Sequence, residues 1–398
     1  MSKSNSLNGS SSSGIRYGPE MRILIVGGGI AGLTLCALLE QRGFSPTVVE
    51  RAHKYGNVGY VIVLWPSGSK ILKGIGLYED LKKVGCDFGD YKICDYKGNS
   101  IHTYTIDPVV EKYGPVISVY RPDLMNVLSK GVRKDSVRMN TALKSLEETD
   151  DDITAYFSDG TSGTYDLVVG CDGIYSKTRS EALGKAEISY SGMAGYAFWS
   201  SPEFSEINGI TEYWGTGKFV KIWPTHNRLA VFVSVRTKPD ISNTPEEKIK
   251  NIQEYLSDFG GVVPDIIRNL DDPYGIYYTE YNDLKISRWS SGRVVLVGDS
   301  AHAILPNAGG GTSMAMESAS VLTEELCRTD SKYFPQAIRQ YEARRKRRVD
   351  KVLNHSRFIG KFFLTDSGPL SLTRNYIMKI YSSRQIFRYW DGILSDAL

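Results

Sequence analysis

A glycine-rich turn between two apolar segments is the feature that most constrains how this chain folds. Residues 22–26 are typical of a buried parallel strand, the apolar residues after Gly29 of a helix, and residues 46–50 of a second strand. Gly27, Gly29 and Gly32 have the spacing GxGxxG. In this context the first glycine permits a tight turn, the second lets a pyrophosphate approach the backbone, and the third lets helix and strand pack closely. The pattern predicts a βαβ unit that binds a dinucleotide, against the alternative of an ordinary glycine-rich turn.

The groups that would hold the dinucleotide follow from this unit. The N-terminus of the helix offers unpaired N–H groups and a positive dipole to phosphates, so Ile30 and Ala31 are assigned to the site together with the glycines. Glu50 ends the second strand, where a carboxylate accepts hydrogen bonds from an adenosine ribose. Arg51, the next residue, is assigned to the same site.

Length and composition restrict the class of protein. The chain has 398 residues, enough for two or three domains, and its net charge of +3 gives no case for nucleic acid as a partner. Five scattered cysteines without metal-ligand spacing indicate reduced thiols, no metal site and a cytoplasmic location. No apolar run approaches the length of a transmembrane helix, about 18 residues. Residues 1–20 are rich in serine and glycine and are interpreted as a disordered leader.

Three apolar segments predict that distant parts of the chain meet at one ligand. Residues 22–26, 167–170 and 293–297 are near-continuous apolar runs, as in strands buried on both faces. Ligands of open α/β sheets lie beyond the carboxyl ends of such strands, so these ends should converge.

The residue pattern changes between the second and the third of these strands, and this change predicts the domain organisation. Residues 185–285 alternate aromatic and β-branched residues with polar ones, as in an antiparallel sheet with one covered face. The predicted fold is therefore α/β: a Rossmann-like nucleotide-binding domain over 21–184 and 286–352, an inserted, mostly antiparallel substrate-binding domain over 185–285, and C-terminal helices over 353–398.

Motifs at the strand ends resemble those of the single-component FAD-dependent aromatic hydroxylases, which have the p-hydroxybenzoate hydroxylase fold. Residues 171–179 resemble the family's Asp-Gly motif, residues 298–306 its Gly-Asp motif, and residues 121–124 its Arg-x-x-Leu helix start. The resemblance implies FAD as the cofactor. It assigns the following residues to FAD: Arg121, Asp172, Gly173 and Asp299.

The glycine-rich loop 306–312, which precedes a predicted helix, extends this site. Such a backbone can lie flat against a ring, and the helix N-terminus stabilises the negative charge of a reduced flavin. The loop residues assigned to FAD are Pro306, Gly309, Gly311 and Thr312.

The resemblance also implies the reaction. NADPH or NADH reduces FAD, O2 adds to give a C4a-hydroperoxide, and one oxygen atom passes to the substrate by hydroxylation or epoxidation, with water excluded. Aromatic residues of the inserted sheet are candidates for the substrate pocket, although alternation lets only about half face the flavin. The substrate-binding assignments are Tyr196, Phe198, Tyr213, Phe219 and Trp223; no catalytic acid or base is assigned.

Departures from the family pattern favour a neutral, bulky, apolar substrate, such as an aromatic, indole, polyketide or terpenoid compound. Val61 replaces a glycine, Trp65 adds bulk, Ser200 stands where many relatives have an arginine for a carboxylate, Trp223 replaces a tyrosine, and Gly310 replaces a glutamine. Natural-product tailoring and antibiotic inactivation are versions of this function. The alternatives are an FAD-dependent oxidase or reductase acting on a prenyl chain, and a flavin-binding module without turnover.

The C-terminal part is aromatic and basic. We expect helices that pack across both domains and close the pocket, rather than a contact with a membrane surface, because no basic polar face alternates cleanly. The basic run 344–348 is interpreted as a solvated helix face, and His302 as a scaffold residue. The chain is expected to be a monomer or homodimer.

Overall fold

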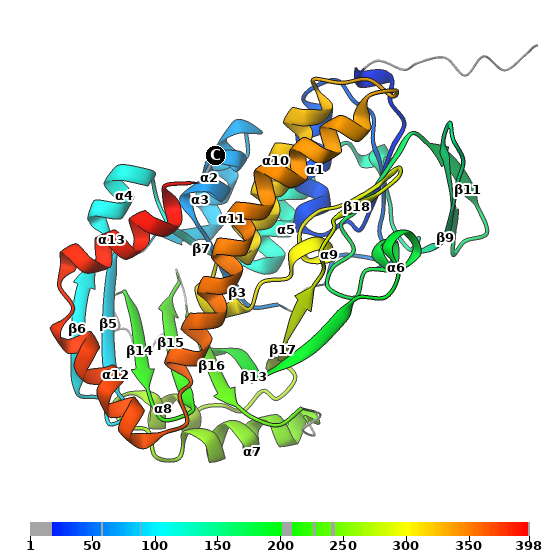
Figure 1. The fold of residues 1–398 in the computed structure, drawn as a ribbon. Coiled ribbons are helices and arrows are strands. Elements are labelled where there is room, and N and C mark those ends of the chain that lie inside the picture. The colour runs from blue at the N-terminus through cyan, green and yellow to red at the C-terminus, as the bar shows by residue number, and fades with distance from the viewer. Residues whose placement is uncertain are drawn as a thin grey trace, which may run out of the picture.

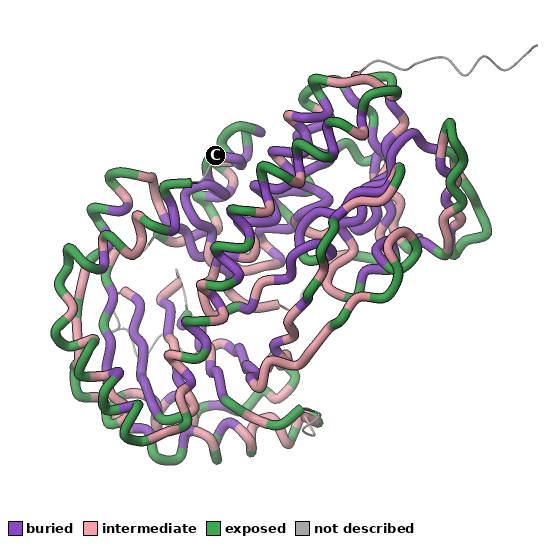
Figure 2. Tube along the Cα trace, viewed as in Figure 1, coloured by how far each residue is buried: buried purple, intermediate pink, exposed green. Residues whose placement is uncertain are grey.

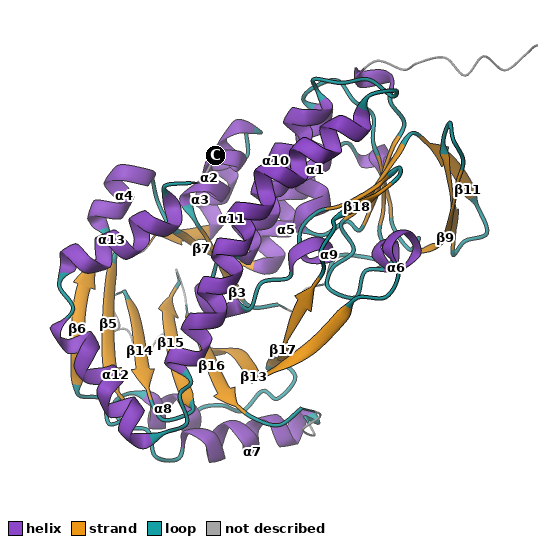
Figure 3. Ribbon diagram, in the orientation of Figure 1, coloured by secondary structure: helices purple, strands orange, loops and turns teal. Residues whose placement is uncertain are grey.

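Two large sheets, connected by helices from the C-terminal third, form the framework of the molecule (Figure 1, Figure 3). The computed structural model describes residues 18–56, 59–87, 89–200, 209–225, 228–239 and 243–396. Residues 1–17 of the predicted leader lie outside the described residues, and Gly18–Glu20 form a short 3-10 helix.

A six-stranded sheet carries the glycine-rich turn. Its strands are β1 (Ile23–Val26), β2 (Thr47–Val49), β8 (Val137–Arg138), β12 (Leu167–Gly170), β18 (Ser290–Ser291) and β19 (Val294–Leu296). Their order is β18-β19-β12-β1-β2-β8, and all neighbours are parallel except β18 and β19. The three predicted apolar strands are therefore adjacent and fully buried, which confirms that their carboxyl ends lie side by side.

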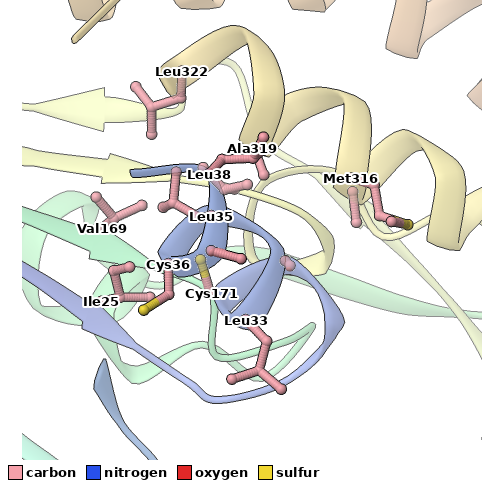
Figure 4. Packing of buried hydrophobic residues seen from close by; sticks show 14 of the residues in the cluster. Ile25, Leu33, Leu35, Cys36, Leu38, Val169, Cys171, Met316, Ala319 and Leu322 are labelled. Atoms are coloured by element: carbon pink, nitrogen blue, oxygen red, sulfur yellow. The ribbon is translucent and has the colours of Figure 1, made fainter. Parts of the chain in front are cut away.

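Helices cover this sheet and fix the turn after β1. Helix α1 (Ile30–Glu40) packs on α10 (Gly311–Leu326), and Figure 4 shows Leu35 and Leu38 of α1 close to Ala319 and Leu322 of α10. Because α1 lies between the sheet and α10, almost all its residues are buried. The same half of the molecule contains the helices α2 (Pro66–Gly74), α3 (Tyr78–Val84), α5 (Arg121–Lys130), α6 (Lys177–Leu183) and α9 (Asp299–His302). It also contains two small sheets. One consists of β3 (Val61–Leu64), β4 (Gly85–Asp87) and β7 (Ile117–Tyr120), and the other of β9 (Leu143–Glu148), β10 (Ile153–Phe157) and β11 (Ser162–Tyr165).

A seven-stranded, mostly antiparallel sheet forms the other half. Its strands, in spatial order, are β17 (Tyr277–Lys285), β13 (Glu187–Ser200), β16 (Leu229–Arg236), β15 (Lys218–Pro224), β14 (Ile210–Trp214), β5 (Asp90–Asp95) and β6 (Ser100–Thr105). Two of these strands come from residues 90–105, so the predicted range 185–285 is too narrow for this sheet. The reason is the parallel pairing of β14 with β5, a long-range contact without a local sequence signal. Helices α7 (Pro245–Leu256) and α8 (Val263–Arg268) pack against one face.

The C-terminal helices are α11 (Phe334–Phe363), α12 (Gly368–Ile380) and α13 (Ser383–Leu394), and α13 packs on α4 (Asp107–Tyr113). The long α11 runs from one half to the other without a break at 353 (Figure 1). The interpretation of its basic run as solvated is wrong for Arg345 and Arg348, which are buried and contact the Glu317 carboxylate of α10 at 2.9 and 3.4 Å. These ion pairs fix α11 to α10.

Candidate functional site

One cavity of ≈ 910 Å³ lies between the two halves of the molecule. Its lining comes from the turn after β1, the ends of β12 and β19, one face of the seven-stranded sheet, and α11, α12 and α13. Segments that are far apart in the sequence therefore line one cavity, as expected where the ends of parallel strands lie side by side.

The glycine-rich turn shapes one end of the cavity through its backbone. Gly27 has a φ of +105°, and a Cβ there would lie 2.5 Å from the carbonyl oxygen of Cys171. A Cβ at Gly32 would collide with the carbonyl oxygen of Gly27, whereas a Cβ at Gly29 would meet only open space. Gly29, Ile30 and Ala31 line the cavity. This arrangement fits the predicted roles: two glycines permit close packing and one leaves room for a pyrophosphate.

Glu50 holds the turn in place. Its carboxylate accepts hydrogen bonds from the backbone N–H groups of Gly28 and Ala52, both at 2.8 Å. Arg51 is exposed, and neither Glu50 nor Arg51 lines the cavity. The hydrogen bond from Glu50 to a ribose stays a prediction, while its role in ordering the phosphate-binding turn is visible in the structure.

The Asp172 carboxylate is bonded within its own loop, and its contact with FAD stays a prediction. Its carboxylate accepts hydrogen bonds from the Ser176 hydroxyl at 2.5 Å and from the N–H and hydroxyl of Thr178 at 2.9 and 3.0 Å, at the start of α6. The side chain therefore orders the helix start and does not line the cavity, whereas Gly173, with φ +80°, does.

Asp299 and Arg121 bring charge to the middle of the cavity. Asp299 follows β19, its side chain is exposed only toward the cavity, and Arg121 begins α5 on the facing wall. The surrounding protein raises the pKa of Asp299 to about 6, and the Arg121 guanidinium acts in the opposite direction. Both residues line the cavity, and their contacts with FAD stay predictions.

The loop before α10 provides a flat wall. Pro306, Gly309, Gly311 and Thr312 all line the cavity, and α10 begins at Gly311. Asn307 also lines it, and its buried amide lies beside Gly360 of α11 without a hydrogen-bond partner among the described residues. A helix N-terminus and open glycines fit the polar edge of a flavin.

Two departures from the family pattern compensate each other. A Cβ at Gly310 would lie 2.5 Å from the indole ring of Trp65, which is 1% exposed and lies at the start of α2. The bulk that Trp65 adds therefore occupies the volume that a larger residue at 310 would need.

The seven-stranded sheet shows which predicted substrate residues reach the cavity. Phe219 and Trp223 line it. Tyr196, Phe198 and Tyr213 instead point to the opposite face, where they pack in one apolar cluster with residues of α7 and α8. These three side chains therefore do not line the cavity. Side chains alternate along a strand, and the face that α7 and α8 cover cannot be read from the alternation itself.

A buried ion pair in the cavity wall was not predicted. Lys221 Nζ lies 2.6 Å from Glu212 Oε1, and the side chains are 18% and 5% exposed. Glu212 Oε2 accepts a hydrogen bond from the Trp214 indole at 2.9 Å. Glu212 and Lys221 lie directly opposite each other in the pairing of β14 with β15. Their opposite charges at paired positions are the sequence feature from which the ion pair could have been predicted. Unpredicted aromatic lining residues of the sheet include Tyr91, Tyr104 and Phe232, while Tyr389 and Trp390 come from the C-terminal helices that were expected to close the pocket.

Several remaining features are structural. His302 is buried, its Nε2 lies 2.9 Å from the Ser318 hydroxyl, and burial lowers its pKa to about 3, as expected of a scaffold residue. Within the described residues, no group of acidic, histidine or cysteine side chains could hold a metal ion. No helix among them is long and apolar enough to cross a bilayer.

Comparisons with known proteins agree with this site. The sequence matches the family model "FAD binding domain" over residues 20–356. It is 30% identical over 377 residues to a 3-amino-4-hydroxybenzoate 2-monooxygenase from Streptomyces cremeus, covering 90% of this chain and 92% of the relative. It is 26% identical over 373 residues to an aurachin C monooxygenase/isomerase from Stigmatella aurantiaca, covering 92% and 96%.

A solved structure matches at the level of the fold. HpxO from Klebsiella pneumoniae, complexed with FAD and uric acid, superposes with a TM-score of 0.90 at 24% identity, covering 96% of this chain and 98% of that one. Fold and site define a flavoprotein. The chain belongs to the FAD binding domain family, and it is an FAD-dependent monooxygenase.

Proposed function

We propose that the protein uses NADPH or NADH and O2 to insert one oxygen atom into a neutral, bulky aromatic substrate. The observation that carries this proposal is the single cavity that joins the flavin end to an aromatic wall of the seven-stranded sheet. When bound, FAD supplies the redox chemistry and activates oxygen. Gly29, Asp299 and the loop before α10 would hold it.

The charges of the cavity support a neutral substrate. Its charged lining residues are Arg121 and Asp299 near the flavin end, and Glu212 and Lys221 in the sheet. Lys221 is already paired with Glu212, so no uncompensated cation in the sheet awaits a substrate carboxylate. A carboxylate near Lys221 would also be repelled by Glu212.

The side chains of the wall have distinct tasks. Phe219 and Trp223 offer flat apolar surfaces to a ring. Lys221, held by Glu212, has further N–H donors for a carbonyl or hydroxyl oxygen of the substrate. Tyr60 lines the cavity, and burial raises its pKa to about 12, so its hydroxyl keeps its proton and can donate it in a hydrogen bond. The C-terminal helices exclude water from the ring.

The test is oxygen transfer by the FAD-loaded enzyme. We would supply NADPH or NADH under 18O2 with a panel that pairs neutral and anionic rings, including 2-naphthol and 2-naphthoate. We expect one 18O atom in a product of a neutral ring, and faster NAD(P)H oxidation with 2-naphthol than with 2-naphthoate. Lys221→Met leaves Glu212 without its cation and should strengthen this preference, while Lys218→Met, which removes a lysine that pairs with Asp258, should leave it unchanged. Product formation without O2, or no 18O in any product despite bound FAD, would contradict the proposal.

A further inference from the structure

The outer side of the C-terminal helices exposes an apolar surface, here called the C-terminal patch. Of the nine large hydrophobic side chains that are exposed among the described residues, six belong to this part of the chain. The patch consists of Phe358, Leu370, Leu372, Tyr376, Ile377 and Ile380. Large exposed apolar patches mark interaction sites, because isolated surface hydrophobics are normally scattered.

The geometry of α12 separates an inner from an outer face. Ser371 and Arg374 are buried, while Leu372, Tyr376 and Ile380, spaced by four residues, are 73%, 65% and 63% exposed. Residues at this spacing form one stripe on a helix. The helix is therefore anchored by one face and presents an apolar stripe on another. Figure 2 shows that much of α12 is exposed.

The charge of this region is mainly positive, between the flanking Asp366 and Asp391. Residues 367–390 contain four basic side chains, Arg374, Lys379, Arg384 and Arg388, and no aspartate or glutamate. Lys379, Arg384 and Arg388 are exposed. An apolar stripe flanked by exposed cations is complementary to an anionic lipid surface, where apolar groups enter the boundary region and cations contact the headgroups.

The patch also meets the cavity. Phe358 and Ile377 belong to both, because they line the cavity and are 65% and 41% exposed. Met378, Tyr381 and Trp390 continue the lining inward from the same helices. The cavity therefore reaches the patch at these two side chains.

We propose that the C-terminal patch docks on the surface of an anionic lipid bilayer, with α12 in the interface and the cavity mouth facing the lipid. An apolar substrate dissolved in the bilayer would then enter without crossing water. A second copy of this chain fits the patch less well, since a two-fold axis would bring the same basic segment against itself. The proposal does not depend on the oxygenation reaction.

The experiment is flotation of the FAD-loaded full chain with vesicles of phosphatidylcholine alone or with about 30% phosphatidylserine. We expect about tenfold more bound protein on the anionic vesicles, and loss of this gain at high salt. The triple variant Leu372→Ser/Tyr376→Ser/Ile380→Ser and the variant Lys379→Glu should each lose binding about tenfold. None of these four residues lines the cavity, so the flavin spectrum should stay unchanged.

A matched control removes an exposed aromatic residue elsewhere. Tyr274 is 74% exposed and lies outside the patch, so Tyr274→Ser should float like the unmodified protein. Equal binding to both vesicle types, no binding, or full binding by the triple variant would overturn the proposal. A dimer in sedimentation velocity that the triple variant abolishes, without vesicle binding, would instead assign the patch to self-association. Because flotation needs no turnover, these outcomes are independent of the oxygenation assay.

Discussion

One wall of the cavity is formed mainly by backbone, and the other mainly by side chains. The nucleotide wall uses backbone: positive-φ glycines, strand ends and the N-termini of α1 and α10. The wall of the seven-stranded sheet uses side chains that alternate between two faces, with Phe219, Lys221 and Trp223 turned inward. A backbone wall tolerates few residue types and therefore leaves a recognisable motif, whereas a side-chain wall depends on which face is covered.

The largest effect should come from the ion pairs that hold the nucleotide wall. Glu317→Gln leaves Arg345 and Arg348 buried without a charged partner, so we expect a loss of about 3–5 kcal/mol in the free energy of unfolding, measured with urea. The control Arg344→Met removes the partly exposed contacts with Glu324 and Glu325 and should cost about 1 kcal/mol or less. Equal losses in the two variants would contradict this ranking.

Gly29→Ala tests whether the backbone wall is shaped for a ligand rather than for folding. The added Cβ meets no protein atom within 4 Å, so the stability of the apoprotein should not change. It enters the space assigned to the pyrophosphate, and we expect FAD affinity to fall by about tenfold, equivalent to about 1.4 kcal/mol. Gly56→Ala, at another open position, is the control. Fluorescence titration with FAD measures the affinity of both variants. An unchanged affinity of Gly29→Ala would contradict the assignment of Gly29 to the pyrophosphate site.

Gly310→Ala tests the compensation with Trp65. The Cβ would press on the indole, and we expect a loss of about 1–3 kcal/mol in unfolding free energy. Trp65→Phe shortens the ring, so the double variant should lose less than the sum of the two single variants. A strictly additive double-mutant cycle would show that the two positions are independent.

Trp223→Ala and Tyr196→Phe compare the two faces of the sheet. Loss of the inward Trp223 ring should raise the dissociation constant of the best ring from the oxygenation panel by about three- to tenfold. Tyr196 donates a hydrogen bond to Asn243 on the covered face, so its variant should alter stability more than ligand affinity. Ligand-induced changes in the flavin spectrum give the dissociation constants of both variants. A larger increase of the dissociation constant in the Tyr196 variant would show that Tyr196, rather than Trp223, faces the ligand.

The smallest effect concerns pH. Between the ordinary carboxyl pKa of 3.8 and about 6, folded apoprotein keeps a proton on Asp299 that the unfolded chain has released. The free energy of unfolding should therefore fall as the pH rises from about 4 to 6, by about 1 kcal/mol or less because cavity water reaches the carboxylate. Asp299→Asn should remove this part of the slope in urea titrations of the apoprotein. An unchanged slope would show that the pKa of Asp299 is ordinary.

Sequence patterns predicted the nucleotide wall closely and the sheet wall only in part. The adjacency of β1, β12 and β19 followed from three buried apolar runs, and the Asp299 and Arg121 positions followed from motifs. The direction of the Tyr196, Phe198 and Tyr213 side chains could not be predicted, because the sequences of β13 and β14 do not indicate which face α7 and α8 cover. The hydrogen bonds from Ser176 and Thr178 to the Asp172 carboxylate were not predicted either, because they depend on how the loop folds onto the start of α6.

By itself, the sequence determined the class of fold and a dinucleotide site, since tight turns and close backbone approaches require glycine at fixed spacing, and the family motifs at the strand ends implied FAD. Only the tertiary structure decided which side chains form the substrate wall, that β5 completes the sheet, and that Lys221 and Glu212 pair inside the cavity. It also left the apolar stripe of α12 uncovered, which the sequence pattern alone does not settle. The physical reason is that burial and charge pairing are properties of contacts between distant segments, while backbone conformation is set by neighbours in the chain.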